Sequence, residues 1–222
     1  MRKFVTFLFT LIILHWFVDN PTNDLLFSAQ FLVQGSIFTG EYHWLLSNML
    51  FNTGMFVLFI ATIFSRLSEI FNLRIYVITR GGESVFKRVL IKKALWEIGK
   101  ILCAKILIYI LFFIIEQRVS RFAVYDLVST FLTLSMFSLV FILCQLRGAN
   151  NKLPLFVLIA GNMLAQILSF DIRALSIVVI ASVYWQEMPF LIIGIKILIL
   201  LLLMMLIFFK KNVDQMLEVK NQ

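Results

Sequence analysis

The sequence predicts an all-α, polytopic membrane protein: a single transmembrane domain over residues 1–222, built from six transmembrane helices. Composition is the first observation behind this prediction, because 61% of the residues are hydrophobic and only 14% are charged, whereas about a quarter of a soluble domain is charged. The second observation is that apolar stretches of about 20 residues, the length that crosses a bilayer, recur along the chain. The third is that basic residues gather in alternate connections between these stretches.

Each predicted span is an apolar stretch bounded by polar or charged residues. The first, residues 4–18, follows Arg2 and Lys3 as a secretory signal would, but no small-residue cleavage pattern comes after it. We therefore interpret it as a short first span. The remaining predicted spans are residues 44–64, 98–115, 122–146, 153–170 and 190–209.

One more apolar run, residues 174–185, is too short to be a further span. Its roughly 12 residues would cover about 18 Å as an α-helix, and the hydrocarbon core of a bilayer is about 30 Å thick. We expect this run, which lies between the fifth and sixth predicted spans, to be a re-entrant or interfacial helix on the outer side.

Lysine and arginine residues in the connections set the expected orientation. On one side they fall at residues 2–3, 66–100, 147–152 and 210–220. Only Arg118, Arg121 and Arg173 fall on the other side. By the positive-inside rule, both termini of this multi-pass protein are predicted to be cytoplasmic. The formal net charge of +8 thus reflects orientation beside membrane lipid, and we expect no nucleic-acid partner.

The longest basic connection, NLRIYVITRGGESVFKRVLIKK (residues 72–93), has a predicted structure of its own. Gly81 and Gly82 are the strongest turn signal in the chain. Ser84 is placed to cap a helix that runs to Trp96 and on into the third span. The helix is moderately amphipathic, and this pattern fits both a helix lying under anionic lipid headgroups and a helix that docks a partner.

The stretch YVITRGGESVFKRVLIKKALW, between the second and third of six spans, resembles the permease subunits of type-2 ATP-binding-cassette (ABC) exporters, of the small bacterial peptide- or bacteriocin-export kind. The resemblance covers the whole chain as architecture. It implies a subunit that moves an amphipathic peptide or other hydrophobic substrate, as a homodimer or as a heterodimer with a second permease. A separate cytoplasmic ABC ATPase would drive it.

The same resemblance implies roles for particular residues. The segment from Arg80 to Trp96 would carry the coupling helix that docks on the ATPase, and residues 174–185 would form the outer gate. Phe86 would be the apolar anchor of the docking contact. The coupling residues carried over in this way are Arg80, Gly81, Gly82, Phe86, Lys87 and Arg88.

No motif in the sequence supports an enzyme. The one Gly-Lys pair, Gly99 and Lys100, is followed by Ile101, so no phosphate-binding loop is present and ATP hydrolysis is expected in the partner subunit. His43 and Asn48 are spaced differently from the oxyanion-hole residues of rhomboid proteases, and no Gly-x-Ser-Gly nucleophile motif is present. We expect neither a cofactor nor a metal ion.

Ionisable residues inside predicted spans are costly, by about 2.5–3.5 kcal/mol at the bilayer centre. Lys105 lies near enough to the inner boundary to snorkel, so we interpret it as structural. Asp126 and Lys196 lie in the outer halves of their helices, where they either form an intramembrane pair or reach the outer interface independently. Four amide residues either line an internal path or join helices; they are Asn48, Asn52, Asn162 and Gln166.

Two other classes of function remain open. One is the substrate-binding subunit of an ECF-type vitamin-uptake transporter, also a bundle of membrane helices, whose first span meets its scaffold through small residues. Residues 4–18 do not contain that small-residue pattern. The other is a non-transporting membrane immunity or stress protein, which the sequence does not distinguish from a permease.

Overall fold

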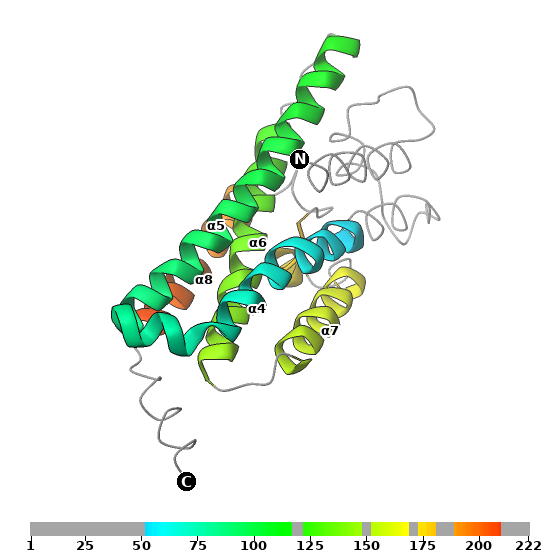
Figure 1. The fold of residues 1–222 in the computed structure, drawn as a ribbon. Coiled ribbons are helices and arrows are strands. Elements are labelled where there is room, and N and C mark those ends of the chain that lie inside the picture. Colours follow the sequence, from blue (N-terminus) through cyan, green and yellow to red (C-terminus); the bar gives the residue numbers. More distant parts are fainter. Residues whose placement is uncertain (1–51, 117–121, 148–151, 169–172, 181–188, 210–222) are drawn as a thin grey trace.

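The computed structural model describes residues 52–116, 122–147, 152–168, 173–180 and 189–209. Every regular element within these ranges is helical (Figure 1). The all-helical fold class is therefore confirmed for the described part of the chain. The first predicted span, residues 4–18, lies outside the described residues, and so does the beginning of the second.

The described helices follow one another along the chain. A helix runs from Asn52 through a π-helical turn, η2 (Ile60–Phe64), into α4 (Ser65–Asn72). The others, in chain order, are α5 (Arg74–Glu116), α6 (Phe122–Leu146), α7 (Lys152–Leu168), the 3₁₀ helix η3 (Arg173–Ile177) and α8 (Pro189–Phe209).

Among the described residues, three helices are long and apolar enough to cross a membrane: Asn52–Asn72, Val124–Leu146 and Phe190–Phe208. They correspond to the second, fourth and sixth predicted spans. The length and apolar character of these helices therefore support the prediction of a membrane protein with transmembrane helices. Residues 98–115 are helical within α5, and α7 contains a shorter apolar stretch, Leu153–Gln166. The total of six spans stays a prediction.

The helix of the second predicted span continues past residue 64, where the sequence interpretation ended it, to Asn72. Leu67 and Phe71 are buried on one face of this extension. Arg66 and Glu69 form an ion pair on the exposed side, with 2.7 Å between Nη1 and Oε2. The helical period of apolar residues thus persists past the predicted end of the second span, and the candidate span Asn52–Asn72 includes this extension.

α6 lies at the centre of the described helices, in contact with α5, α7 and α8 (Figure 1). In its most apolar stretch 72% of the residues are buried, compared with 17% for α8. Buried hydroxyl residues such as Ser135 and Ser138 on α6 are small enough to let neighbouring helices approach closely. The buried polar side chains of α6 therefore face neighbouring helices and not lipid.

Aromatic rings join the helix 52–72 to α6. The ring of Phe137 meets those of Phe56 and Phe59 edge-on, at centroid distances of 5.4 and 5.7 Å. Further along, Phe141 meets Phe64 at 4.7 Å. Such ring pairs each contribute about 0.5–1.5 kcal/mol beyond the burial of their surface, so these contacts fix the two helices against each other.

α5 changes direction at Gly82, where φ is 77° and ψ is 170°. Glycine adopts a positive φ without the steric cost that a side chain brings, so the predicted turn at Gly81 and Gly82 is confirmed. α5 therefore has two arms: residues 74–81 form a short helix, and residues 83–116 form a long one. We name residues 73–82 the elbow; it lies at the lower left of Figure 1.

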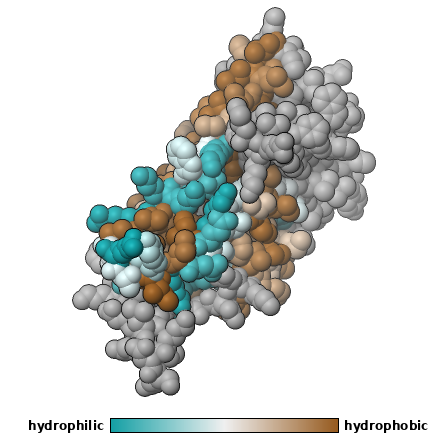
Figure 2. All heavy atoms as spheres, viewed as in Figure 1, coloured by the Kyte–Doolittle hydropathy of each residue, from teal (hydrophilic) through white to brown (hydrophobic). Residues whose placement is uncertain are grey.

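The elbow marks one end of the described bundle. α4 and α8 both end near it, and the long arm of α5 runs from it past α6 to the far end (Figure 1). Figure 2 shows hydrophilic residues gathered around the elbow end of α5 and hydrophobic residues covering its far end. This distribution is typical of a helix that passes from an aqueous or interfacial region into lipid.

Candidate functional site

A cluster of polar side chains is buried where α5, α6 and α8 meet the non-helical residues that follow η3. We name it the polar cluster and define it by its side chains and two main-chain groups. Its side chains are Asn52, Lys105, Tyr109, Asp126, Ser129, Thr130, Thr133 and Lys196, and its main-chain groups belong to Val179 and Ile180. Ionisable groups buried at this depth in a membrane helix bundle are a functional-site hypothesis by default.

Lys105 and Asp126 form the ion pair of the polar cluster, with 2.5 Å between Nζ and Oδ2. The Tyr109 hydroxyl donates to the same carboxylate oxygen at 2.6 Å, and the Lys105 ammonium also donates to Thr130 Oγ1 at 2.9 Å. Lys105 is 0% exposed. The interpretation that Lys105 snorkels to the inner boundary is therefore wrong, because α6 offers it a carboxylate and a hydroxyl inside the bundle.

Lys196, on α8, is also 0% exposed, and its ammonium group is surrounded by acceptors. It donates to Ser129 Oγ at 2.7 Å, to Thr133 Oγ1 at 2.8 Å and to the main-chain oxygen of Val179 at 2.8 Å. Each of these oxygens can accept a hydrogen bond from one N–H of the ammonium group. The charge is thus solvated by protein groups in place of water.

The residues after η3 carry their polar main-chain groups into the interior. Val179 and Ile180 are buried and are neither helix nor strand. The Ser129 hydroxyl donates to Ile180 O at 2.6 Å, and Ile180 N donates to Asn52 Oδ1 at 3.0 Å. Non-helical backbone is tolerated at membrane depth only where protein satisfies its polar groups. The polar cluster does this from three directions: α6, α8 and the start of the helix at Asn52.

Asp126 and Lys196, the predicted intramembrane pair, both belong to the polar cluster. The ion pair that Asp126 makes at 2.5 Å is with Lys105, and Lys196 reaches α6 through Ser129 and Thr133, which lie further along that helix. Their energetic coupling stays a prediction. Among its described side chains, the polar cluster thus has two lysines and one aspartate.

Sequence reasoning missed Lys105 as the partner of Asp126, although a signal was present. Asp126, Ser129, Thr130 and Thr133 recur at the spacing i, i+3, i+4 and i+7, so they form a polar stripe along an otherwise apolar helix. Lys105 and Tyr109, four residues apart, also share a face of α5. Two such stripes on consecutive apolar helices indicate that the stripes face each other.

The amide residues that lie within the described residues connect helices. Asn52 bonds to Ile180 N, and Gln166 on α7 accepts a hydrogen bond of 3.2 Å from Thr53. These contacts support the interpretation that amides join helices. Asn162 is buried on α7, and Asn48 lies outside the described residues.

The structure separates the six predicted coupling residues into two sets. Phe86 is only 1% exposed, and its ring meets that of Phe71 edge-on at 5.5 Å. Lys87 is buried as well and pairs with Glu83, with 2.5 Å between Nζ and Oε1. Phe86 is therefore not exposed in this structure, because its ring fills the contact between α4 and α5, and its role as a docking anchor stays a prediction. The exposed set is Arg80, Gly81, Gly82 and Arg88.

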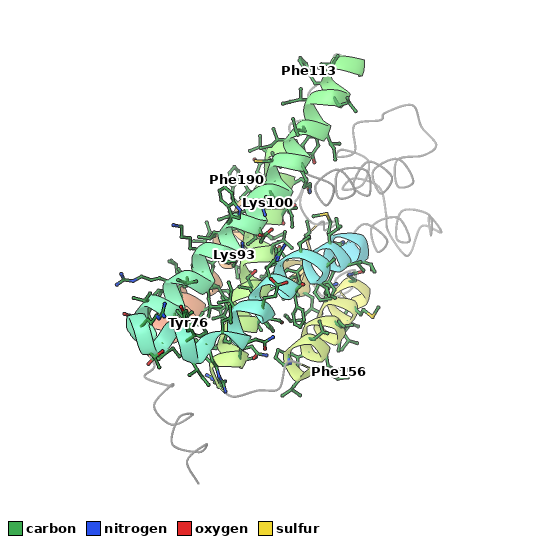
Figure 3. The ribbon with its side chains drawn as sticks, in the orientation of Figure 1. Tyr76, Lys93, Lys100, Phe113, Phe156 and Phe190 are labelled. Atoms are coloured by element: carbon green, nitrogen blue, oxygen red, sulfur yellow. The ribbon has the colours of Figure 1, made fainter. Side chains whose placement is uncertain are left out.

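The elbow has exposed apolar side chains that the sequence did not single out. Leu73 is 59% exposed and Tyr76 is 54% exposed, and the Arg80 guanidinium lies 4.1 Å from the centroid of the Tyr76 ring. Figure 3 shows Tyr76 at the elbow, with Lys93, Lys100 and Phe113 following in turn along α5 toward the far end. The exposed surface of the elbow thus includes Tyr76, with Arg80 over its ring, and the side chain of Leu73.

Within the described ranges, no group of three or more His, Cys, Asp or Glu side chains is placed to hold a metal ion. No known protein family, curated protein or solved structure matches this chain significantly. The polar cluster and the elbow are therefore the two features from which a function is argued.

Proposed function

We propose that the chain is the membrane-spanning permease subunit of an ABC exporter, which moves an amphipathic peptide or other hydrophobic substrate and is driven by a separate cytoplasmic ATPase. It is a multi-pass protein of the bacterial cytoplasmic membrane with both termini cytoplasmic, and it works as a homodimer or as a heterodimer with a second permease. The observation that carries this proposal is the elbow, a short helix with exposed side chains between two longer helices at the basic end of the bundle.

The elbow supports the proposal because one of its faces is suited to a soluble protein partner. Tyr76 and Arg80 are four residues apart on the short helix and share one side of it, with the Arg80 guanidinium over the Tyr76 ring. Leu73, which is also exposed, lies directly before this helix. Exposed tyrosine and arginine residues commonly dominate protein–protein contacts. We name these three residues the docking face, and it replaces Phe86 as the proposed contact with the ATPase.

A continuous path of packed residues leads from the docking face to the polar cluster. Phe86, just beyond the turn at Gly82, is fixed against Phe71 on α4. The long arm of α5 then extends from this contact to Lys105, which binds Asp126 on α6. In this proposal, a displacement of the elbow by the ATPase would move α4 and α5 together and would act on the buried ion pair.

The residues after η3 fit the role of an outer gate in this proposal. Of these residues, Val179 and Ile180 are held by hydrogen bonds to side chains of α6, α8 and Asn52. Such bonds are exchanged when the helices that supply them shift relative to one another. The polar cluster would then hold the gate closed until α5 moves.

Purification of the tagged chain from its native membranes in mild detergent tests the proposal. We expect a soluble ATPase subunit with a phosphate-binding loop to co-purify with the wild-type chain. The double substitution Tyr76→Ala with Arg80→Ala should reduce the co-purified ATPase and its stimulated hydrolysis roughly tenfold or more, as loss of an aromatic contact residue commonly does.

Phe113→Ala is the matched control, because Phe113 is also an exposed aromatic residue but lies at the far end of α5 (Figure 3). It should leave the amount of ATPase unchanged. If Phe113→Ala and the docking-face variant lose the ATPase equally, the docking face is wrong. If no such ATPase accompanies the wild-type chain, the permease proposal itself is wrong.

A further inference from the structure

A groove of about 700 Å³ lies between the long arm of α5 and the end of α8, at the elbow end of the bundle. Its surface is almost entirely apolar, so the basic residues among its lining, Arg88, Lys92 and Lys93, contribute mainly their aliphatic stems. Apolar side chains form the rest of the lining, and these include Leu95 on α5 with Met204 and Phe208 on α8. We name this feature the basic groove. Its volume is within the range of pockets that bind small molecules, about 300–1,000 Å³.

The basic groove has an apolar side that suits the acyl chains of a lipid and a hydrophilic side that suits its headgroup. Its α8 side belongs to the last turns of a candidate membrane span, Phe190–Phe208, whose surface is largely exposed. Its α5 side belongs to the hydrophilic region around the elbow (Figure 2). Trp96, which also lines the groove, is 65% exposed, and exposed tryptophan is typical of the membrane–water interface.

The charge at the basic groove is positive even after its nearest carboxylate is considered. Lys93 lies 3.4 Å from Glu97, so one of the three basic side chains is balanced by an acid. Glu97 also accepts hydrogen bonds from Lys100 at 2.9 Å. Arg88 and Lys92 add further positive charge to the same rim, and each such residue near a membrane surface attracts anionic lipid.

We propose that the basic groove binds one anionic phospholipid from the leaflet next to the elbow. The phosphate is held by Arg88 and Lys92, and an acyl chain lies along Leu95, Met204 and Phe208. A phospholipid is the occupant that matches both linings, because the apolar part of the groove is continuous with the exposed surface of α8, where a water-soluble acidic peptide has no access. This inference needs α8 to be in the membrane and is independent of the ATPase.

Native mass spectrometry of the delipidated protein in detergent tests the site, with phosphatidylglycerol and phosphatidylcholine of identical acyl chains as probes. We expect the wild-type chain to bind phosphatidylglycerol more tightly. The double substitution Arg88→Gln with Lys92→Gln should weaken phosphatidylglycerol binding roughly 30-fold and leave phosphatidylcholine binding nearly unchanged. The matched control Arg74→Gln with Arg147→Gln, which removes the same charge outside the groove, should change neither affinity appreciably.

Two further measurements separate a lipid site from a general attraction for anions. Val89→Phe with Leu95→Phe fills the groove without removing charge, and it should weaken the binding of both lipids. Soluble glycerol phosphate should compete poorly, because it lacks the acyl chain. The proposal is overturned if the control pair weakens phosphatidylglycerol binding as much as the groove pair, if the wild-type chain has no preference between the lipids, or if glycerol phosphate binds as tightly as the lipid.

Discussion

Lys196, in the middle of α8, donates a hydrogen bond of 2.8 Å to the main-chain oxygen of Val179, which belongs to a segment that is neither helix nor strand. The same ammonium group binds Ser129 and Thr133 on α6. One side chain thereby connects two long helices to the non-helical segment between them. The position of Val179 therefore depends in part on Lys196, together with the bonds that Ser129 and Asn52 make to Ile180.

Replacing Lys196 by methionine should therefore release this segment. Ser176 lies on η3, directly before this segment, and its side chain is fully buried. Ser176→Cys in a background without Cys103 and Cys144 therefore reports whether η3 and the segment after it become exposed. In that background, Lys196→Met should raise the rate of thiol labelling at position 176 roughly tenfold or more, since each lost hydrogen bond is worth about 0.5–1.5 kcal/mol.

The control for this experiment is Ser138→Cys, a buried position on α6 away from the segment. Its labelling should stay slow in the Lys196→Met protein. Equal acceleration at positions 138 and 176 would mean that the whole bundle has loosened, and no acceleration at 176 would show that Lys196 does not hold the segment.

The polar stripe on α6 explains how much of this site a sequence reveals. The spacing of Asp126, Ser129 and Thr133 is visible in the sequence, as are the apolar character and length of α6 and α8. What the stripe faces is not visible, because a lysine such as Lys105 has a side chain long enough to reach the interface or to stay inside. The main-chain acceptor at Val179 is even less visible, since every residue has the same carbonyl group.

At the elbow, too, the sequence predicts the local backbone but not the tertiary contacts. The turn at Gly82 was predictable because few residues other than glycine adopt its backbone angles. The burial of Phe86 was not, because it depends on contact with Phe71, in a helix that the sequence interpretation ended before that residue. Tertiary contacts of this kind decide which apolar residues of a short segment are exposed.

The ion pair of Lys105 with Asp126 predicts strong energetic coupling. Lys105→Met and Asp126→Asn should each lower the stability of the detergent-solubilised protein by about 3–5 kcal/mol, because each leaves its partner buried without its ion pair. The double variant should cost clearly less than the sum of the two. A double-mutant cycle on thermal unfolding measures this, and additive costs would contradict the pairing.

A second cycle, with Asp126→Asn and Lys196→Met, tests the pair predicted from the sequence. Because Lys196 binds hydroxyl and main-chain oxygens, its coupling to Asp126 should be positive but smaller than that of Lys105. If the stability costs of the two substitutions simply add, Asp126 and Lys196 are not coupled and the predicted pair is wrong.

Gly82 and Gly99 should respond to alanine in opposite directions. At Gly82 the positive φ of 77° makes Gly82→Ala destabilising by about 1–3 kcal/mol, although no atom lies within 4 Å of the added methyl group. Gly99 is inside the long arm of α5 and also has open space around it. Gly99→Ala should therefore stabilise the protein by about 0.5–1 kcal/mol. Thermal unfolding of the two variants measures both signs, and stabilisation by Gly82→Ala would contradict the turn geometry.

The predicted orientation is tested by single cysteines at Ser84, next to the elbow, and at Asn150, between α6 and α7. Both positions are expected on the cytoplasmic side, as the distribution of basic residues indicates. In a background without Cys103 and Cys144, an impermeant thiol reagent should label each cysteine only after the membrane is opened. Labelling of either position in intact cells would reverse the assigned orientation.

Phe86 and Tyr76 provide the sharpest comparison at the elbow, because each contributes one aromatic ring and only one of the rings is exposed. Phe86→Ala removes a ring packed against Phe71 and should lower stability by about 3–5 kcal/mol. Tyr76→Ala removes an exposed ring and should change stability by less than about 0.5 kcal/mol. Thermal unfolding in detergent measures both effects.

The same two variants separate docking from folding. If the docking face binds the ATPase, Tyr76→Ala should lose the partner while it unfolds at the wild-type temperature. Phe86→Ala should lose the partner only in proportion to the protein that has unfolded, since its ring faces α4 and not the solvent. A Phe86→Ala protein with wild-type thermal stability and no bound ATPase would restore Phe86 as the anchor, and would mean that α4 and α5 separate when the partner binds.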